Sequence, residues 1–398
     1  MNEQMPSFVH GAVSDPLQYL TLGQLIERAA ALHGAREALV ARHQQIRLSY
    51  AQLNARVDEL AAGLVALGLE PGARIGIWSP NCAEWVIAQF ATAKAGLVLV
   101  NINPAYRLSE LEYALNKVEC AALITATTFK SSDYLMMIRT LAPEILAAPP
   151  GKLQATRLPH LRSVIAIDTA SHAGMYRFGD VAGFATADSR ARLAEIAVAA
   201  QPDDAINIQF TSGTTGMPKG ATLTHFSVIN NGYFVGQAMR FSAEDRLCIP
   251  VPLYHCFGMV MSVLTCVIHG ATMVFPADSF DAKSVLEAVA AERCTALHGV
   301  PTMFIAELDH PDFASYDLSS LRTGIMAGAP CPIEVMKRVL AEMHMTEVTI
   351  AYGMTETSPV SFQSGVDDPL EKRVSTIGRI HPHVQVKIVD PEGRTVPR

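Results

Sequence analysis

The stretch 205–225 reads AINIQFTSGTTGMPKGATLTH. Ile206, Ile208 and Phe210 alternate with polar residues, a spacing that is typical of a half-buried strand. A run of hydroxyl residues and glycines follows, and Lys219 lies just behind it. Small residues leave backbone N–H groups bare to form an anion-binding nest, and lysine adds a mobile positive charge. The stretch therefore predicts a strand that leads into a polyphosphate-binding loop.

The loop differs from the common P-loop, which needs Lys followed by Ser or Thr and then a helix. Here Pro218 precedes the lysine, Gly220 follows it, and residues 221–224 predict a second strand. The string TSGTTGMPKG (211–220) closely resembles the phosphate loop of the adenylate-forming superfamily, which contains acyl-CoA synthetases, luciferases and peptide-synthetase adenylation domains. The resemblance implies that ATP phosphates are held by Thr211, Ser212, Gly213, Thr214, Thr215, Gly216 and Lys219.

The alternation of strands and helices predicts an α/β fold with doubly wound parallel sheets. Strands are expected at 74–79, 97–101 and 121–125, with helices at 83–96 and 109–117 between them. Because 398 residues exceed one ordinary core, we expect two α/β subdomains packed together. The expected units are 1–200, 201–375 with the phosphate loop, and 376–398, which resembles the start of a small β-barrel subdomain.

Earlier in the chain, two helix starts are expected from capping residues. Thr21 precedes an apolar pattern at helical spacing, and Ser49 precedes a helix that extends to about Leu67. Trp78 and Trp85 fall inside the strand and helix pattern, so core packing is their expected role.

The string PVPLYHCFG (250–258) is the second candidate site. It resembles the superfamily's acyl site, in which His255 lies beside the carboxylate or gates a tunnel; without that resemblance, a loop histidine held by a backbone carbonyl is the more natural interpretation. An apolar helix behind it would line the pocket. The resemblance also places 298–302 (HGVPT) beside the acyl group, although a plain strand-to-helix turn is as consistent. The expected acyl-pocket residues are His255, Cys256, Phe257, Gly258, Met259, His298, Gly299 and Val300.

Two further strings resemble the superfamily's nucleotide site. Small residues Gly328, Ala329 and Pro330 can pack against a flat adenine. In YGMTET (352–357), an aromatic face at Tyr352 suits stacking, and Glu356 offers a hard oxygen ligand for Mg²⁺. The implied AMP contacts here are Tyr352, Gly353, Met354 and Thr355, the implied metal ligands are Glu356 and Thr211, and the implied catalytic residues are Lys219, His255, Thr355 and Glu356.

Composition narrows the possible partners. The net charge is −7 and no Lys/Arg run occurs, so nucleic acid and anionic membrane are not expected as partners. Seven scattered cysteines without a C-x-x-C pair indicate a reducing cytoplasm. No apolar window is long enough to span a bilayer, and the N-terminal sequence does not look like a secretion signal. The oligomeric state, monomer or homodimer, stays open.

The expected reaction is adenylation of a fatty acid, followed by transfer to CoA. ATP, Mg²⁺ and CoA are the implied cofactor and co-substrates, and the finer resemblance is to medium-chain fatty acyl-CoA synthetases. From Pro252 to Leu264 there is no charged residue, and burying a charged group without a partner costs several kcal/mol. An uncharged acyl chain is therefore favoured over an amino acid or a dicarboxylate.

Several alternatives remain open at this point. The chain could be an acyl-AMP ligase with a carrier-protein acceptor, an aryl-acid ligase, or a remnant that binds nucleotide or acyl-adenylate without turnover; a P-loop kinase fits poorly. Superfamily members continue beyond this point with a ribose-binding Asp, a hinge and a catalytic Lys in a C-terminal domain. We therefore expect a truncated or domain-only chain with doubtful full activity.

Overall fold

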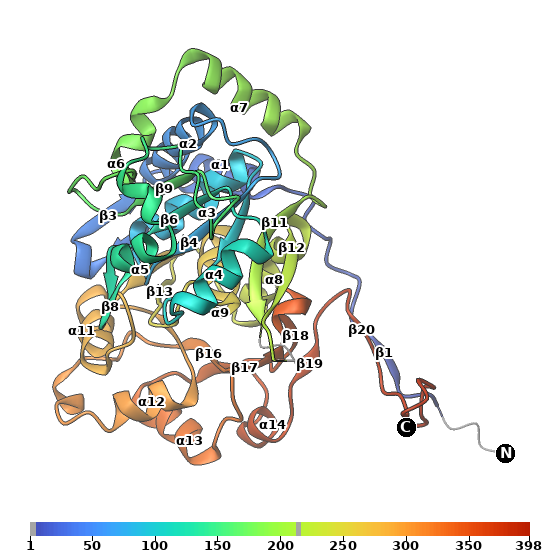
Figure 1. Ribbon diagram of the computed structural model, residues 1–398. Coiled ribbons are helices and arrows are strands. Elements are labelled where there is room, and N and C mark those ends of the chain that lie inside the picture. The colour runs from blue at the N-terminus through green and yellow to red at the C-terminus, as the bar shows by residue number, and fades with distance from the viewer. Residues whose placement is uncertain (1–4, 212–215) are drawn as a thin grey trace.

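Two large β-sheets organise the computed structural model, which describes residues 5–211 and 216–398 (Figure 1). The first has seven strands in the order β10-β9-β6-β4-β5-β11-β12, and every neighbouring pair is parallel except β11 with β12. In sheet order the strands are Tyr176–Arg177, Ser163–Ala166, Ala122–Thr125, Arg74–Trp78, Val98–Asn101, Ala205–Thr211 and Lys219–Thr224.

The second sheet has nine strands in the order β19-β18-β17-β16-β15-β13-β14-β2-β3. Neighbours are parallel from β17 to β2, and the strands outside this block are antiparallel. In sheet order they are Arg379–Ile380, Val360–Gln363, Glu347–Gly353, Thr323–Ala327, Ala296–Gly299, Arg246–Cys248, Thr272–Phe275, Glu37–Ala41 and Ile46–Ser49. The expected α/β architecture with doubly wound sheets is confirmed.

Helices pack around both sheets. In the upper part of Figure 1, α3 packs on β5 of the first sheet, and α1, α2 and α7 pack against α3, while α2 also contacts β2 and β3 of the second sheet. In the lower part, α11, α12 and α14 pack on the second sheet, and α13 packs against α12 and α14. The helices α1 to α8 span Leu22–His33, Tyr50–Ala66, Ala83–Lys94, Leu108–Lys117, Tyr134–Leu141, Phe178–Val181, Ala187–Ala199 and His225–Ala238. The helices α9 to α14 span Cys256–Gly258, Thr265–His269, Ala282–Glu292, Pro301–Leu308, Ile333–Glu342 and Leu370–Ser375.

Both predicted helix starts are confirmed. The Thr21 side chain accepts the N–H of Gln24, and Ser49 accepts that of Gln52, each in a capping box. Trp78 and Trp85 are fully buried, and Trp78 stacks on Tyr134 with ring centroids 3.5 Å apart. The described helices include none that is both long and apolar enough to cross a membrane.

The sheets exchange strands across residue 200. Strands β2 and β3 lie in the nine-stranded sheet, whereas β11 and β12 lie in the seven-stranded sheet. One core cluster accordingly joins Ile77 of the first sheet, Phe275 of the second and Trp85 of α3. Each sheet therefore contains strands from before and after residue 200. The expected domain boundary at residue 200 stays a prediction.

The segment 376–398 does not form a closed barrel. Strand β19 joins the nine-stranded sheet, and β20 (Gln385–Lys387) pairs antiparallel with β1 (Phe8–His10). In Figure 1 this two-stranded ribbon, with the C-terminal end of the chain, extends away from the main body. The alternating pattern at 384–388 thus does mark a strand, and its partner is the beginning of the chain.

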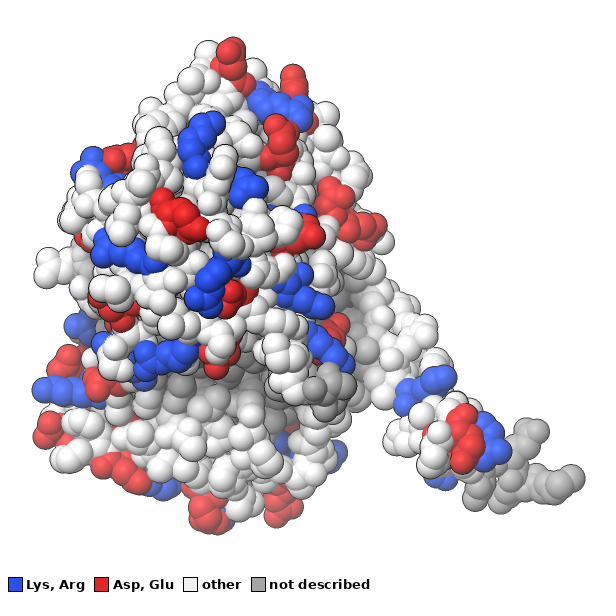
Figure 2. Space-filling model, in the orientation of Figure 1, with Lys and Arg blue, Asp and Glu red and all other residues white. Residues whose placement is uncertain are grey.

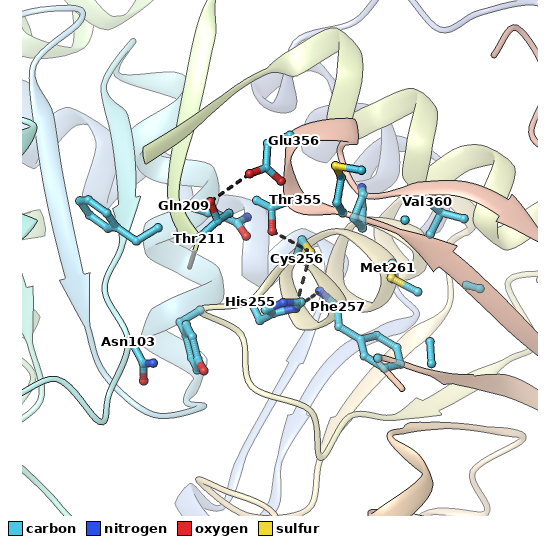
Figure 3. Close-up of a pocket in the computed structure, with 18 of the residues that line it drawn as sticks. Asn103, Gln209, Thr211, His255, Cys256, Phe257, Met261, Thr355, Glu356 and Val360 are labelled. Carbon is cyan, nitrogen blue, oxygen red and sulfur yellow. Dashed lines mark hydrogen bonds between the residues drawn. The ribbon is translucent and has the colours of Figure 1, made fainter. Parts of the chain in front are cut away.

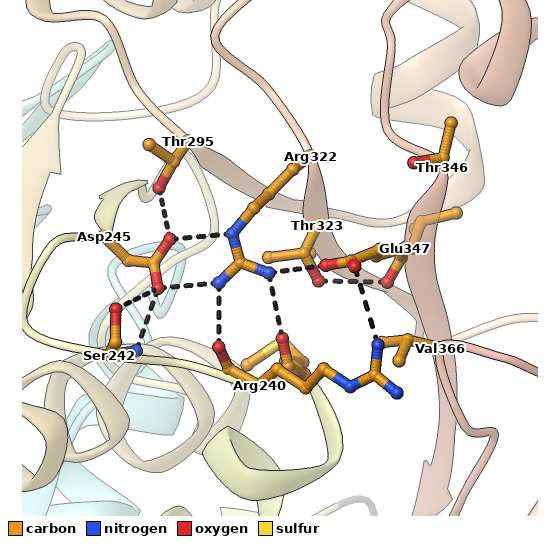
Figure 4. Close-up of polar contacts among 12 residues, drawn as sticks. Arg240, Ser242, Asp245, Thr295, Arg322, Thr323, Thr346, Glu347 and Val366 are labelled. Atoms are coloured by element: carbon orange, nitrogen blue, oxygen red, sulfur yellow. Dashed lines mark hydrogen bonds and ion pairs between the residues drawn. The ribbon is translucent and has the colours of Figure 1, made fainter.

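A cluster of charges ties together the amino ends of four strands of the second sheet (Figure 4). Arg322 donates to Asp245 at 2.7 Å and to Glu347 at 2.6 Å, while Thr295 donates to Asp245 at 2.7 Å. These residues stand at or just before β16, β13, β17 and β15. The cluster stabilises this edge of the sheet, and the opposite, carboxyl edge is where α/β folds bind ligands.

Candidate functional site

A cavity of about 720 Å³ lies where residues from the carboxyl ends of both sheets meet (Figure 3). The surface view in Figure 2 shows a hollow between the upper and lower parts of the molecule. Acidic and basic side chains are interspersed over the face shown. The cavity is lined by Asn103, Tyr106, Gln209, Phe210, Thr211, Pro218, Tyr254, His255, Cys256, Phe257, Met261, Ala327, Gly328, Ala351, Tyr352, Gly353, Met354, Thr355, Glu356, Pro359 and Val360.

Thr211 and Glu356 bring the two sheets together at this cavity. Thr211 ends β11, and Glu356 lies in η6 (Thr355–Thr357), the short helix behind β17. The Thr211 Oγ1 hydroxyl donates to Glu356 Oε1 at 2.9 Å, as Figure 3 shows. Among the described lining residues, Glu356 is the one carboxylate. The sequence prediction that these two residues lie together is consistent with this geometry.

The turn after β17 needs its glycine for a close backbone approach. A Cβ on Gly353 would lie 1.8 Å from the carbonyl oxygen of Pro359, and Met354 N–H donates to that same oxygen at 3.0 Å. This contact turns the chain so that Tyr352, half-exposed, and Thr355, buried, both line the cavity. Tyr352 contacts Phe362 edge-on with ring centroids 6.1 Å apart, and its exposed part is available for stacking.

His255 is fixed by the helix that it begins. Its Nδ1 accepts the N–H of Phe257 at 3.1 Å, so in the neutral ring the proton is on Nε2. The surrounding protein partly desolvates His255, which is exposed to the cavity, and this lowers its pKa below the ordinary value. The ring that lines the cavity is therefore neutral at pH 7 and carries one N–H donor.

Cys256 lies between the two predicted ends of the site. Its Sγ is 3.5 Å from His255 Nδ1 and 3.7 Å from Thr355 Oγ1. Burial raises the pKa of this thiol to about 11, so it is a neutral, compact wall residue. The His255 loop and the YGMTET turn are thereby in contact.

The apolar helix expected behind Gly258 is present; it is buried from Met259 to Val267 and half-buried at Ile268. It runs through a π-helical segment, Met259–Leu264, into α10. A Cβ on Gly258 would lie 2.4 Å from Pro252 O, which explains the glycine. Met261 lines the cavity, whereas Gly258 and Met259 lie behind the wall. A π-segment shifts which residues face a given side, and helical sequence periodicity gives no warning of it.

His298, Gly299 and Val300 do not line the cavity in the described structure. His298 is fully buried at 3.0 Å from Ser262 Oγ, and its ring packs behind Phe257 with centroids 5.5 Å apart. Burial lowers the pKa of His298 to about 3. Its direct contact with an acyl group stays a prediction; the structure gives it the position of a support for Phe257.

The predicted nucleotide contacts divide in a similar way. Gly328, with a positive φ of 87°, lines the cavity together with Ala327, whereas Ala329 and Pro330 are exposed outside it. Lys219 is exposed at the start of β12, and its neighbour Pro218 lines the cavity. Gly216 has a φ of 94°, and the predicted phosphate contacts Ser212, Gly213, Thr214 and Thr215 lie outside the described residues.

Sequence reasoning missed several lining residues of the first sheet. Asn103 and Tyr106 follow β5, and Gln209 and Phe210 stand near the end of β11. Their position after adjacent parallel strands was a usable signal, because such ends meet at one edge of a sheet. Tyr254 was quoted within its motif without a role, and it also lines the cavity.

Comparison with known families and curated proteins gives consistent matches. The model of the family described as AMP-binding enzyme matches residues 26–398. The putative acyl-CoA synthetase YngI of Bacillus subtilis (strain 168) is 47% identical over 375 residues, which are 94% of this chain and 68% of that protein. The mitochondrial medium-chain acyl-CoA ligase ACSF2 of Danio rerio is 45% identical over 98% of this chain and 65% of its own length. The chain therefore spans about two thirds of these relatives.

Solved structures share the fold. The inhibitor-bound N-terminal domain of FACL13 from Mycobacterium tuberculosis matches with a TM-score of 0.76 and 26% identity, over 94% of this chain and 86% of that one. The anthranilate CoA ligase AuaEII in complex with anthranoyl-AMP matches with a TM-score of 0.82 and 23% identity, over 96% of this chain and 68% of that one.

Proposed function

The chain belongs to the family of AMP-binding enzymes, and on that premise we propose that its cavity binds an acyl-adenylate formed from ATP and an uncharged carboxylic acid. The whole protein would be an AMP-forming fatty acid–CoA ligase, most similar to medium-chain enzymes. The single observation that carries this proposal is that one cavity unites the nucleotide motifs and the acyl motif, with Glu356 as the one carboxylate in its described lining.

Bringing together a carboxylate and ATP, both negatively charged, requires positioning and charge neutralisation. We assign Lys219 and the loop 211–216 to the phosphates, and Gly328, Tyr352 and the residues beside them to adenine. A substrate carboxylate oxygen attacks the α-phosphorus, and pyrophosphate leaves in line. The neutral His255, with its N–H donor, would hold the carboxylate, and Thr355 would donate to the α-phosphate. In the second step the thiol of CoA attacks the acyl-adenylate and AMP leaves.

The donor set suits Mg²⁺. Glu356 and Thr211 offer a carboxylate and a hydroxyl 2.9 Å apart, and Mg²⁺ is typically bound by one or two carboxylates together with substrate phosphates. Among the residues that the structure describes, no group of three or more His, Cys, Asp or Glu side chains could hold a metal by itself. Bound Mg²⁺ would supply charge neutralisation at the phosphates, and Glu356 would orient it.

The acyl end of the cavity has the chemistry of an uncharged chain. Phe257, Met261 and Val360 supply apolar surface, and Gln209, Asn103 and the tyrosines are neutral. A charged second group on the acid would find no opposite charge there, which disfavours amino acids and dicarboxylates.

A cytoplasmic location also remains part of the proposal; all seven cysteines are buried free thiols, consistent with a reducing compartment.

A calorimetric titration with non-hydrolysable acyl-adenylate analogues of increasing chain length, and AMP as reference, tests the proposal. Each methylene buried contributes about 0.8 kcal/mol, so affinity should rise about fourfold per CH₂ until the cavity is filled. By analogy with medium-chain enzymes, we expect that limit at about eight to twelve carbons. Equal affinity for AMP and for every acyl analogue would refute the proposal.

A pair of methionine variants controls for unspecific effects. Met261→Gln places an amide in the cavity lining and should weaken the rise with chain length. Met136→Gln changes an exposed methionine of α5 and should leave the rise unchanged. Loss of the rise in both variants would mean that the chain-length effect does not come from this cavity.

A further inference from the structure

The loop 250–254, which leads to His255, has few backbone partners of its own. Pro250 and Pro252 have no N–H, and the loop leaves the nine-stranded sheet just after β13. Its own backbone supplies one long contact, from His255 N–H to Pro252 O at 3.3 Å. Because buried backbone groups need partners, something outside the loop must hold it.

Asn81 holds the middle of the loop from the other sheet. It lies three residues beyond β4, is 2% exposed, and makes hydrogen bonds to the loop with both polar atoms of its side-chain amide. Nδ2 donates to Val251 O at 2.9 Å, and Oδ1 accepts the N–H of Leu253 at 2.9 Å. This pair of hydrogen bonds fixes the position and the direction of the backbone at residues 251–253.

Asn101 holds the residue directly before His255. It ends β5, is 1% exposed, and donates from Nδ2 to Tyr254 O at 3.0 Å. Asn207 of β11 fixes the orientation of this amide, because its Nδ2 donates to Asn101 Oδ1 at 2.8 Å and to Leu99 O at 2.8 Å. The Asn101 amide therefore cannot flip without losing a buried bond.

These contacts join parts of the site that come from different sheets. The His255 loop follows a strand of the nine-stranded sheet, as does the Tyr352–Glu356 turn, whereas Asn101 ends β5 of the seven-stranded sheet and Asn81 lies in the loop after β4 of that sheet. Cys256, next in the chain, touches Thr355 of the turn. A shift at Val251, Leu253 or Tyr254 would thus move the acyl end of the cavity relative to its nucleotide end.

We propose that Asn81 and Asn101, which do not line the cavity, are positioning residues that set the place of His255 and of the acyl end relative to the nucleotide end. The inference rests on the proposed function. Asn81 and Asn101 then contribute to the affinity for the acyl group, and their loss should leave the affinity for AMP unchanged. A merely structural role would instead lower stability and affect both ligands alike.

The test compares Asn101→Ala and Asn81→Ala with a matched control in the 398-residue chain. Asn230 is buried and does not line the cavity; its amide bonds to the backbone of Gln18 through both Oδ1 and Nδ2, at 2.8 and 3.0 Å. The measured quantity is the ratio of the Kd for AMP to the Kd for an octanoyl-adenylate analogue. Asn101→Asp and Asn81→Asp keep the side-chain shape and remove the donor, so they serve if an alanine variant fails to fold.

The expected result is a fall of about tenfold or more in that ratio for the Asn101 and Asn81 variants, with the Kd for AMP unchanged. Asn230→Ala should keep the wild-type ratio even if its melting temperature falls. An unchanged ratio in folded Asn101 and Asn81 variants overturns the inference while the proposed function stands. A wild-type protein that binds the analogue no better than AMP overturns the proposed function, and this inference with it.

Discussion

Replacing Glu307 with methionine should stabilise the protein. Glu307 lies on α12, is fully buried, and neither carboxyl oxygen has a hydrogen-bond partner in the described structure. Its neighbours in the helix, Phe304 and Leu308, belong to an apolar core cluster that also contains Cys248. Burial raises the pKa of Glu307 well above its ordinary value, so the group is held protonated. Methionine has a similar length and no group that needs a partner.

The magnitude follows from the missing partners. An unsatisfied buried polar group costs about 1–3 kcal/mol. Unfolding entropy scales with length at about 2.1 cal/mol/K per residue, which gives roughly 0.8 kcal/mol/K for this chain and a rise in Tm of about 1–4 °C. The gain should grow with pH. Because the pKa of Glu307 is higher in the folded protein than its ordinary value of 4.5, the unfolded chain ionises this group first as pH rises above 4.5. The wild type therefore loses stability between pH 4.5 and the folded pKa, and the methionine variant does not.

Thermal unfolding of wild type and Glu307→Met at pH 5 and pH 8 measures both effects. Glu334→Met is the matched control, because Glu334 is solvent-exposed on α13 and pairs only with Lys337. We expect a positive shift at pH 5, a larger one at pH 8, and little change for the control. A Glu307→Met protein that melts below wild type at both pH values would refute the claim that this carboxyl is unpartnered.

Three further predictions concern the site and its supports. Glu356→Gln removes the one carboxylate of the described cavity lining, so the gain in ATP affinity on adding Mg²⁺, measured by calorimetry, should fall about tenfold or more; an undiminished gain would place the metal elsewhere. Burial raises the pKa of Cys256 to about 11, so fewer than about one thiol in a thousand is ionised at pH 7.5 and iodoacetamide labelling should be far slower than for a free thiol. Burial lowers the pKa of His225 to about 4 while its Nδ1 accepts the N–H of Leu22. It therefore gives stability that is lost as pH falls from 6.5 toward 4, and His225→Gln should flatten Tm against pH in that range.

Much of the fold was readable because local signals agreed with it. The caps Thr21 and Ser49, and the strand-helix alternation from residue 74 to 125, gave elements that the structure has at nearly the same bounds. What the sequence could not supply is which strands meet. Pairing of β2 with β14, or of β20 with β1, joins segments more than 200 residues apart, and no local propensity encodes such contacts.

The candidate site shows the same division. The motifs around His255 and Tyr352 were identified from their residues, and both line one cavity. His298 resembled an acyl contact, yet its ring lies behind Phe257, because strand alternation and helix packing decide which side of a motif faces the cavity. The asparagine supports were not identified, since Asn81 and Asn101 act through bonds to a loop about 150–170 residues away.

A crystal structure of the chain with an octanoyl-adenylate analogue tests the central claim most directly. The account predicts adenine against Tyr352 and Gly328, the phosphate-like linkage near Thr355, and the alkyl chain against Phe257 and Met261. An analogue bound outside this cavity, or with its alkyl chain directed into solvent, would contradict the claim that one cavity holds both the nucleotide and the acyl group.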